Sequence, residues 1–196
     1  MLEKLIIATT NSHKVEEIED IFNNSIKEVL RMPDDIGEII EDGNSFFENA
    51  LIKAKAVYYH TKLPSLADDS GLCINALNGE PGIYSSRYGG EKLSYKEKMK
   101  LILDKLKDKS DRSAYFITSA VCIIDNNYYF AVEGRVNGKI IESERGIEGF
   151  GYDPIFIPDN YNITYAEMTL EEKNKISHRA IAMNKMKTIL ESIYKL

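Results

Sequence analysis

The sequence predicts a mixed α/β fold, because helical patterns occur early and late in the chain while consecutive strand patterns occupy its middle. A strict alternation of strands and helices is therefore not expected. With 196 residues, of which 43% are hydrophobic and 29% charged, the chain is long enough for one sizeable core. No internal repeat, low-complexity tract or Pro/Ser-rich linker interrupts it, so we expect residues 1–196 to form a single domain.

Strand and helix patterns follow one another in the first half of the chain. Apolar residues recur with a helical period after Asn11 or Ser12, either of which can cap a helix. Ser45 and Glu48 have the spacing of a capping box. In order, the predicted elements are a strand at residues 4–9, the helix from the Asn11/Ser12 cap, a strand at 28–32, a helix from Ser45 to about His60, and two strand segments at 66–67 and 72–77.

The second half carries two more capping boxes, Ser94 with Glu97 and Thr169 with Glu172. Two β-rich runs separated by Asn126-Asn127 predict a hairpin. In order, the predicted elements are a helix from Ser94 to about Lys107, strands at 115–125 and 128–136, a third consecutive strand at 139–144, a strand at 155–157, a short helix after Thr169 and a long helix from about His178.

Charge balance and cysteine usage limit the function classes. The 25 Lys and Arg residues against 31 Asp and Glu give a formal charge of -6, which argues against a binder of nucleic acid polymers but not against one small anionic ligand. Cys73 and Cys122 lie in apolar runs without CxxC spacing, which favours buried, reduced thiols over a disulfide. No apolar segment has the length of a membrane span or a signal-peptide core, so we expect a soluble, cytoplasmic protein without a membrane partner.

The turn from Thr9 to Lys14, TTNSHK, is the first candidate site, because it joins the first strand to the first helix. A helix N-terminus offers unpaired N–H groups and the positive end of the helix dipole, which favour phosphate. An ordinary capped helix is the alternative for this stretch alone. The Walker A pattern GxxxxGK[ST] does not occur in the chain.

Two acidic pairs are candidates for a magnesium site. Asp68 and Asp69 follow the short run SLA and precede Ser70, and Glu41 and Asp42 precede a capped helix. Mg²⁺ takes oxygen ligands and often joins one or two carboxylates to substrate phosphates. The alternative is that both pairs are solvated loop acids, although acids beside a core strand need a partner for their charge.

The loop at residues 149–154, GFGYDP, contains half of a dinucleotide-binding fingerprint. Pro154 stands where the third glycine would be, and a strand follows where a helix is needed, so a dinucleotide site is not expected. The aromatic residues of this loop can stack on a base, and Asp153 can accept hydrogen bonds from base N–H groups. A structural turn is the alternative.

Basic residues gather near the start of the last helix, where Lys173 and Ser177 have the i,i+4 spacing that places side chains on one face. A solvated helix face is the alternative interpretation. The cations available to neutralise a polyanion are Lys14, Lys53, Arg87, Lys173, His178 and Arg179. Residue types and spacing together indicate a Mg²⁺-dependent nucleotide-binding protein.

The motifs ATTNSHKVEEI, DGNSFFENALIKA, LADDSGLCINALNGEPGIYSSRY, GFGYDPIF and TYAEMTLEEKNKISHR, in this order from residue 8 to 179, resemble the inosine triphosphate pyrophosphatase family, also called XTP/dITP diphosphatases. The resemblance implies hydrolysis of ITP, dITP and XTP to the monophosphate and pyrophosphate with Mg²⁺. It also implies a homodimer whose elongated mixed sheet forms two lobes with a central active-site groove. The visible departure is Thr10, where many members have a glycine that lets the backbone approach phosphate.

The resemblance also implies roles for individual residues. Asp69 would be the general base or metal-anchoring carboxylate, with Ser70 beside the substrate. Glu41 would be the second metal ligand, with Asp42 as the alternative, and Lys53 would contact phosphate. The other implied contacts are Thr9, Thr10, Asn11, Ser12, His13 and Lys14 for phosphate, Phe150, Gly151, Tyr152 and Asp153 for the base, and Lys173, His178 and Arg179 to complete the nucleotide pocket.

Two other interpretations compete with this one. A Maf-like nucleotide pyrophosphatase would carry out a similar reaction on pyrimidine or modified nucleotides, but the SHR ending and the FGYD loop speak against it. A nucleotide sensor without turnover would not need Asp69, Glu41 and the lysines to arrange a water.

Overall fold

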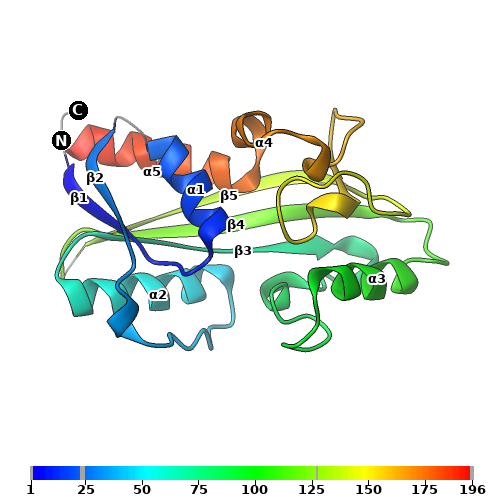
Figure 1. Cartoon of the computed structure of the whole chain (residues 1–196), viewed down its shortest axis with the longest axis horizontal. Coiled ribbons are helices and arrows are strands. Elements are labelled where there is room, and N and C mark those ends of the chain that lie inside the picture. The colour runs from blue at the N-terminus through cyan, green and yellow to red at the C-terminus, as the bar shows by residue number, and fades with distance from the viewer. Residues whose placement is uncertain (1, 23–24, 127, 195–196) are drawn as a thin grey trace. The chain divides into compact units, whose positions relative to one another are not determined.

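The computed structural model describes residues 2–22, 25–126 and 128–194, and it is built on one 6-stranded sheet (Figure 1). The strands are β1 Leu2–Ile7, β2 Ile26–Arg31, β3 Ser65–Ile74, β4 Ser113–Ile123, β5 Tyr129–Ile140 and β6 Phe156–Pro158. The helices are α1 Ser12–Phe22, α2 Phe46–Thr61, α3 Tyr95–Lys105, α4 Leu170–Ile176 and α5 His178–Tyr194. The strand order is β2-β1-β3-β4-β5-β6. β1 pairs in parallel with β2 and β3, and β5 pairs antiparallel with β6, so the predicted mixed α/β class is confirmed.

β3 is one continuous strand, and the prediction of two segments at 66–67 and 72–77 is wrong. The acidic residues Asp68 and Asp69 suggested a strand end, but they lie inside the strand, where Lys14 contacts Asp68 and Asn49 contacts Asp69. Residues 75–77 form a short 3₁₀ turn instead of the end of a strand.

The second half also departs from the prediction at one strand. β5 runs on to Ile140, so the separate strand expected at 139–144 does not form. Gly138 pairs with Pro158 of β6, so the strand continues through residues 137–138. β4 and β5 are neighbours in the sheet, as the hairpin predicted, although Asn127 of its turn lies outside the described residues.

The predicted capping boxes fix the starts of three helices. At α3 and α4 both halves of the box are present, Ser94 with Glu97 and Thr169 with Glu172. At α2 the Ser45 hydroxyl accepts from the backbone N–H of Glu48, but the Glu48 carboxylate accepts from the backbone N–H of Asn44, one residue before the cap. The helix start was therefore predictable even where its second hydrogen bond was not.

The chain forms two compact units, each built from separate segments. Unit 1 comprises Met1–Asp69, Thr118–Gly134 and Arg179–Leu196, and unit 2 comprises Ser70–Ile117 and Arg135–His178.

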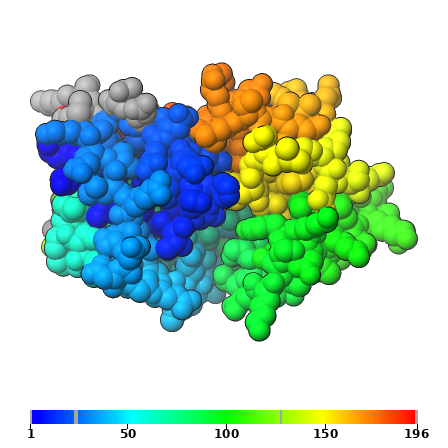
Figure 2. Space-filling view, viewed as in Figure 1, coloured from blue at the N-terminus to red at the C-terminus, as the bar shows by residue number. Residues whose placement is uncertain are grey.

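Unit 1 has helices on both faces of its strands. α1 and α5 lie on one face and α2 lies on the other, as Figure 1 shows. Each face has its own core. Leu66 packs with α1 and α5, whereas the next residue, Ala67, packs with α2. In Figure 2, α1 and the residues that follow β2, in shades of blue, form part of the surface of this unit.

Unit 2 has a separate core in which Leu72 and Ile74 of β3 pack with Ile102 of α3. Aromatic side chains fill much of the remaining core, with Phe116 and Phe156 meeting edge to face at a ring distance of 4.8 Å. Aromatic edge-to-face pairs contribute to stability beyond their buried area.

Both cysteines are buried free thiols, and burial raises the pKa of Cys122 to about 12. Neither thiol is therefore poised to act as a nucleophile. Among the helices of the described residues, none combines the length and the apolar character that crossing a membrane requires.

Candidate functional site

Asp68 and Asp69 point to opposite faces of the sheet, because successive side chains of a strand alternate. Asp68 follows the register of Leu66 and faces α1 and α5, whereas Asp69 follows Ala67 and faces α2. The pair is therefore not one acidic site. Each acid has its own set of partners within unit 1.

Asp68 is the centre of a buried charge network, which we define as Lys14, Glu17, Asp68 and Arg179. Asp68 Oδ2 accepts from Lys14 Nζ at 2.9 Å and from both Nε and Nη2 of Arg179 at 3.2 Å. The third guanidinium nitrogen, Nη1 of Arg179, donates to Glu17 Oε2. Two cations therefore face two carboxylates, and the network is neutral as a whole.

These contacts shift the pKa values of the network strongly. Burial alone would raise the pKa of Asp68, but Lys14 and Arg179 hold it well below its usual range. Burial would lower the pKa of Arg179, but Asp68 and Glu17 raise it. Burial lowers the pKa of Lys14 despite the attraction of Asp68. Asp68 is thus ionised and held by protein cations, which leaves Asp69 as the candidate metal ligand of the two.

Asp69 lies on the other face, among side chains of α2. Asn49 Nδ2 donates to Asp69 Oδ2 at 3.0 Å, and Lys53 Nζ lies 4.0 Å from Asp69 Oδ1. The same Lys53 ammonium donates to Glu41 Oε2 at 2.8 Å. Burial raises the pKa of Asp69 even though Lys53 and Lys14 act against it. The environments of two adjacent aspartates therefore push their pKa values in opposite directions.

Glu41 and Asp69 fit a divalent cation. Both carboxylates converge on one positive charge, the Lys53 ammonium, which marks where a bound cation would be favourable. Asp42 is exposed, whereas Glu41 is partly buried, so Glu41 is the better placed of the two predicted alternatives. Among the described residues no group of three or more His, Cys, Asp or Glu side chains could hold a metal. A site of two carboxylates suits Mg²⁺, which commonly completes its coordination with water and phosphate.

The Thr9–Lys14 turn forms the start of α1 as predicted, and Asn11 is its cap. Asn11 Oδ1 accepts from the backbone N–H groups of His13 at 3.1 Å and Lys14 at 3.3 Å. The Asn11 N–H in turn donates to the Thr9 hydroxyl. The backbone at Thr10 is not left-handed, so a glycine is not needed there for conformation.

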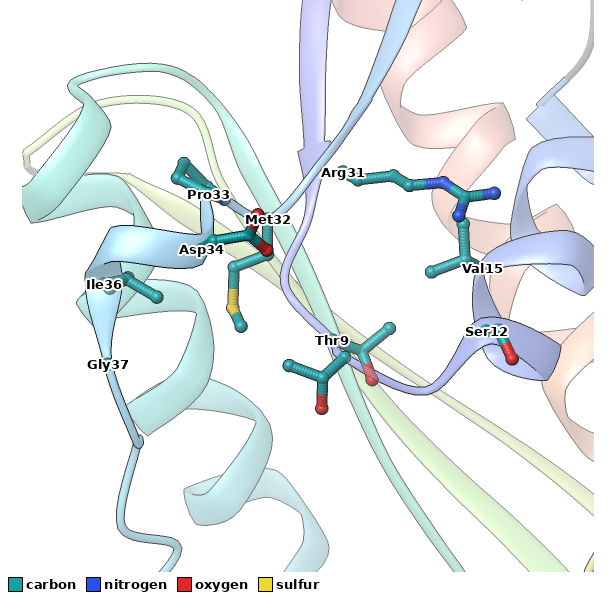
Figure 3. Close-up of a pocket in the computed structure, with 10 residues that line it drawn as sticks. Thr9, Ser12, Val15, Arg31, Met32, Pro33, Asp34, Ile36 and Gly37 are labelled. Atoms are coloured by element: carbon teal, nitrogen blue, oxygen red, sulfur yellow. The ribbon is translucent and has the colours of Figure 1, made fainter.

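A pocket of about 300 Å³ opens beside this turn, at the carboxyl ends of β1 and β2 (Figure 3). Hydroxyl groups line one side of it, and the segment after β2 lines the other. Its lining residues are Thr9, Thr10, Ser12, Val15, Arg31, Met32, Pro33, Asp34, Ile36 and Gly37.

In unit 2, Asp153 organises the Gly-rich loop. Asp153 Oδ2 accepts from the Phe150 backbone N–H at 2.9 Å and from Lys173 Nζ at 2.7 Å. At Gly149, which has a φ of +71°, an added Cβ would lie 2.3 Å from the same oxygen, so only glycine fits there. The Lys173 ammonium also lies 4.7 Å from the centre of the Phe150 ring. The loop is therefore fixed from inside by a buried ion pair.

The aromatic residues of this loop differ in exposure. Tyr152 is buried and its hydroxyl donates to the Ser85 carbonyl at 2.8 Å, whereas Phe150 is partly exposed. Burial raises the pKa of Tyr152, so it stays a neutral hydrogen-bond donor. Phe150 is therefore the accessible ring of the loop.

The start of the last helix is buried, which contradicts the alternative of a solvated face. The exposed fractions are 3% for Lys173, 0% for Ser177, 4% for His178 and 1% for Arg179. The His178 ring stacks on Phe116 at 4.6 Å and 10°.

Four other predicted residues occupy more peripheral positions. His13 is exposed, and Ser70 and Gly151 are partly exposed. Arg87 of unit 2 lies 5.0 Å from the ring centre of Tyr84.

Sequence reasoning missed Glu17, Asn49 and Phe116. Two of them had a usable signal, because Glu17 lies three residues after Lys14 and Asn49 lies four residues before Lys53, spacings that place side chains on one helix face. Phe116 had none, because an aromatic residue in a β-rich run is typical of any core strand.

Comparison with known proteins gives a consistent result. Residues 5–189 match the model of the Ham1 family. A dITP/XTP pyrophosphatase of Treponema denticola is 44% identical over 186 residues, covering 92% of this chain and 94% of its own. A dITP/XTP pyrophosphatase of Aquifex aeolicus is 41% identical and covers 98% of both chains.

Solved structures agree with these relatives. A HAM1 protein from Coxiella burnetii has a TM-score of 0.90 and 38% identity, covering 98% of this chain and 100% of its own. The Ham1 protein of Staphylococcus aureus has a TM-score of 0.86 and 36% identity, covering 97% and 99%.

The opposite pKa shifts of the adjacent aspartates predict opposite effects of the same substitution on stability without divalent cations. Asp68 stabilises the fold when ionised, a contribution present above the ordinary aspartate pKa and lost as pH falls toward the lowered value. Asp68→Asn leaves Lys14 and Arg179 short of a charge and should cost about 3–5 kcal/mol at pH 7.

The contribution of Asp69 to stability has the opposite pH dependence. Its raised pKa means that the protonated form is favoured by folding, a contribution present below the ordinary pKa and lost as pH rises through the raised value. Asp69→Asn should therefore leave the free energy of unfolding at pH 7 unchanged or increased. Urea unfolding of both variants in EDTA checks this, and equal destabilisation by the two would contradict it.

The buried pair of Asp153 and Lys173 predicts strong coupling within unit 2. Asp153→Asn leaves the Lys173 ammonium unpaired and should cost about 3–5 kcal/mol. Lys173→Met in the same chain should recover most of that loss, because the uncompensated charge is gone. Urea unfolding of the two single variants and the double variant measures the coupling, and purely additive losses would refute it.

Proposed function

Because the chain belongs to the Ham1 family, we propose that it hydrolyses the non-standard purine nucleoside triphosphates ITP, dITP and XTP, releasing the monophosphate and pyrophosphate. The resemblance found in the sequence motifs is confirmed by the family match and by the relatives. The observation in the structure that carries the proposal is that the Glu41 and Asp69 carboxylates both lie beside the Lys53 ammonium. Such an enzyme clears deaminated purines from the nucleotide pool.

The topology of unit 1 supports a ligand site at the carboxyl end of β1. β1 is followed by α1 and β2 on one side, and β2 is followed by α2 and β3 on the other side of β1. The strand order therefore reverses at β1, and ligands of open α/β sheets bind outside the carboxyl ends of the strands at such a point. The Thr9–Lys14 turn leaves the end of β1, and the Ala8 N–H donates to Leu66 in the adjacent β3. In β3, Asp68 and Asp69 come just after Leu66 and Ala67.

In the proposed site, Glu41 and Asp69 hold a divalent cation, and the motif resemblance makes magnesium the proposed ion. Such a cation would supply positive charge against the phosphates and would polarise a water molecule. Lys53, whose ammonium donates to Glu41, is the proposed phosphate contact beside this site. Asp42, which is exposed, is not needed as a ligand.

Asp69 acts as the general base in this proposal. Burial raises the pKa of Asp69, which makes it a better proton acceptor than an ordinary aspartate. The water oxygen attacks the α-phosphorus, its proton passes to Asp69, and the bond from the α-phosphorus to the bridging oxygen breaks as pyrophosphate leaves. Lys14 and Lys53 stabilise the charge on the departing group, and Ser70 follows Asp69 directly as a substrate contact.

The Thr9–Lys14 turn is proposed to bind the phosphates through its backbone N–H groups, its hydroxyls and the N-terminus of α1. Asn11 has a supporting role, because its side chain already caps the helix. Arg179 also supports the site from within, since its guanidinium is held by Asp68 and Glu17. His13 and Arg87 remain proposed contacts from the motif and charge patterns.

Base recognition is proposed for residues of unit 2. Phe150 offers the accessible ring for stacking, and Lys173 and His178 offer donors, while Asp153 and the buried Tyr152 hold the loop containing Gly151 in shape. Donors that face a 6-oxo group discriminate against ATP, whose 6-amino group would leave them unpaired.

The two units act as one domain, because the chain passes between them at residues 69/70, 117/118, 134/135 and 178/179. The protein forms a homodimer, as the motif resemblance implies. It works in the cytoplasm, where its reduced thiols are stable.

A panel of nucleoside triphosphates with Mg²⁺ tests the reaction. ITP, dITP and XTP should yield monophosphate and pyrophosphate, with ATP turned over far more slowly, by analogy with sites that reject analogues through unpaired polar groups. Chromatography of the products distinguishes the alternatives. Release of orthophosphate would reject the proposed bond, preference for pyrimidines would favour a Maf-like enzyme, and binding without products would indicate a sensor.

Asp69→Asn should lower the turnover rate about 10²-fold or more, because both the proposed base and a proposed metal ligand are lost. The exposed Asp42 gives a matched control, and Asp42→Asn should retain turnover. Steady-state rates with ITP measure both variants. Near-normal turnover of the Asp69 variant would remove Asp69 from the mechanism.

A further inference from the structure

Asn49 bridges the two parts of the proposed metal site with one amide group. Its Nδ2 donates to Asp69 Oδ2 at 3.0 Å, and its Oδ1 accepts from the Gly43 backbone N–H at 2.9 Å. Gly43 lies two residues after Glu41, so the amide links the segment that carries one carboxylate to the strand that carries the other. Asn49 is 1% exposed, and water does not compete for these hydrogen bonds.

The orientation of this amide is determined by its neighbours. A backbone N–H can only donate, so the Gly43 side must meet the carbonyl oxygen of Asn49 and the Asp69 side must meet the NH₂ group. The contact is also built into the sequence. A Cβ at Gly43 would lie 2.7 Å from both Asn49 Oδ1 and Glu48 Cβ, so the segment reaches Asn49 only because residue 43 is glycine.

Lys53 makes a second bridge between the same two partners. It lies one helical turn after Asn49, and its ammonium contacts Glu41 Oε2 at 2.8 Å and lies 4.0 Å from Asp69 Oδ1. The two bridges differ in charge. A divalent cation placed between the carboxylates would repel the ammonium, but it would not disturb the neutral amide.

We propose that Asn49 is the positioning residue that holds Glu41 and Asp69 together as a divalent-cation site, while Lys53 is the internal counterion that the cation displaces. This inference deepens the proposed function and rests on its assignment of Glu41 and Asp69. The amide bridge keeps the carboxylates in place during the exchange, which limits the reorganisation that cation binding requires.

The two bridges therefore have opposite effects on cation affinity. Loss of the Asn49 amide should weaken binding about 10–100-fold, the usual effect of removing a partner that orients a metal ligand. Loss of the Lys53 charge should strengthen binding of the cation alone, because a competing positive charge is removed, although turnover should fall with the loss of a proposed phosphate contact. A purely structural role for both residues would weaken binding in both variants.

The experiment measures Mn²⁺ binding to the full chain by electron paramagnetic resonance, without nucleotide. Asn49→Leu is expected to raise the Mn²⁺ dissociation constant about 10–100-fold, and Lys53→Gln is expected to lower it. Asn49→Ser is a second variant in case leucine prevents folding. Asn44→Leu, the same substitution at an exposed asparagine just before the helix, is the matched control and should change nothing.

Amide hydrogen exchange supplies a readout that does not need metal. Exchange at Gly43 should accelerate in the Asn49 variants, while amides of the α2 interior, such as Ala54, keep their protection. Unchanged Mn²⁺ affinity in the Asn49 variants, unchanged exchange at Gly43, or weaker Mn²⁺ binding in Lys53→Gln would each overturn the proposal.

ITP hydrolysis by the unsubstituted protein tests the proposed function separately. The predicted pattern of Mn²⁺ affinities in a chain that does not hydrolyse ITP would refute the function and support the assignment of Asn49. Hydrolysis of ITP by the unsubstituted protein, together with Mn²⁺ affinity that is unchanged in the Asn49 variants, would support the function and refute the assignment of Asn49.

Discussion

The ion pairing of Asp68 with Lys14 and Arg179 is the interaction on which the rest of unit 1 depends. A carboxylate in the middle of a buried strand is unfavourable unless cations and hydrogen bonds replace its water. Here the cations come from α1 and α5, helices from opposite ends of the chain. The charge of one strand residue thereby ties the first and last helices to the same face of the sheet, and Glu17 completes the neutralisation of Arg179.

The alternation of side chains along β3 divides two identical acids between two tasks. Asp68 is ion-paired with protein groups and contributes to stability, whereas Asp69 is held partly buried with its pKa raised by that burial. The raised pKa means that the ionised form of Asp69 is less favourable in the folded chain than in the unfolded chain. The contrast in environment, more than the presence of acids, distinguishes Asp69, the proposed metal ligand, from its neighbour.

Unit 2 uses the same physical device for a different purpose. The Asp153–Lys173 pair is buried beside aromatic rings, and Asp153 also accepts a hydrogen bond from the backbone of the glycine-containing loop. The pair thereby holds the Lys173 ammonium beside the Phe150 ring. In both units, buried ion pairs set the geometry around groups that remain partly accessible.

The sequence by itself determined the fold class, the capped helix starts and the family, because these depend on local patterns: apolar periodicity, capping boxes and an ordered set of motifs. Even the candidate residues Asp69, Glu41 and Lys53 could be named from those motifs. Tertiary structure alone decided which acid of the Asp68-Asp69 pair is satisfied internally, that Tyr152 points inward, and that Asn49 joins Gly43 to Asp69. These facts depend on which side chains from distant segments meet, and the free energy of a buried charge or amide is fixed by those partners and not by its neighbours in sequence.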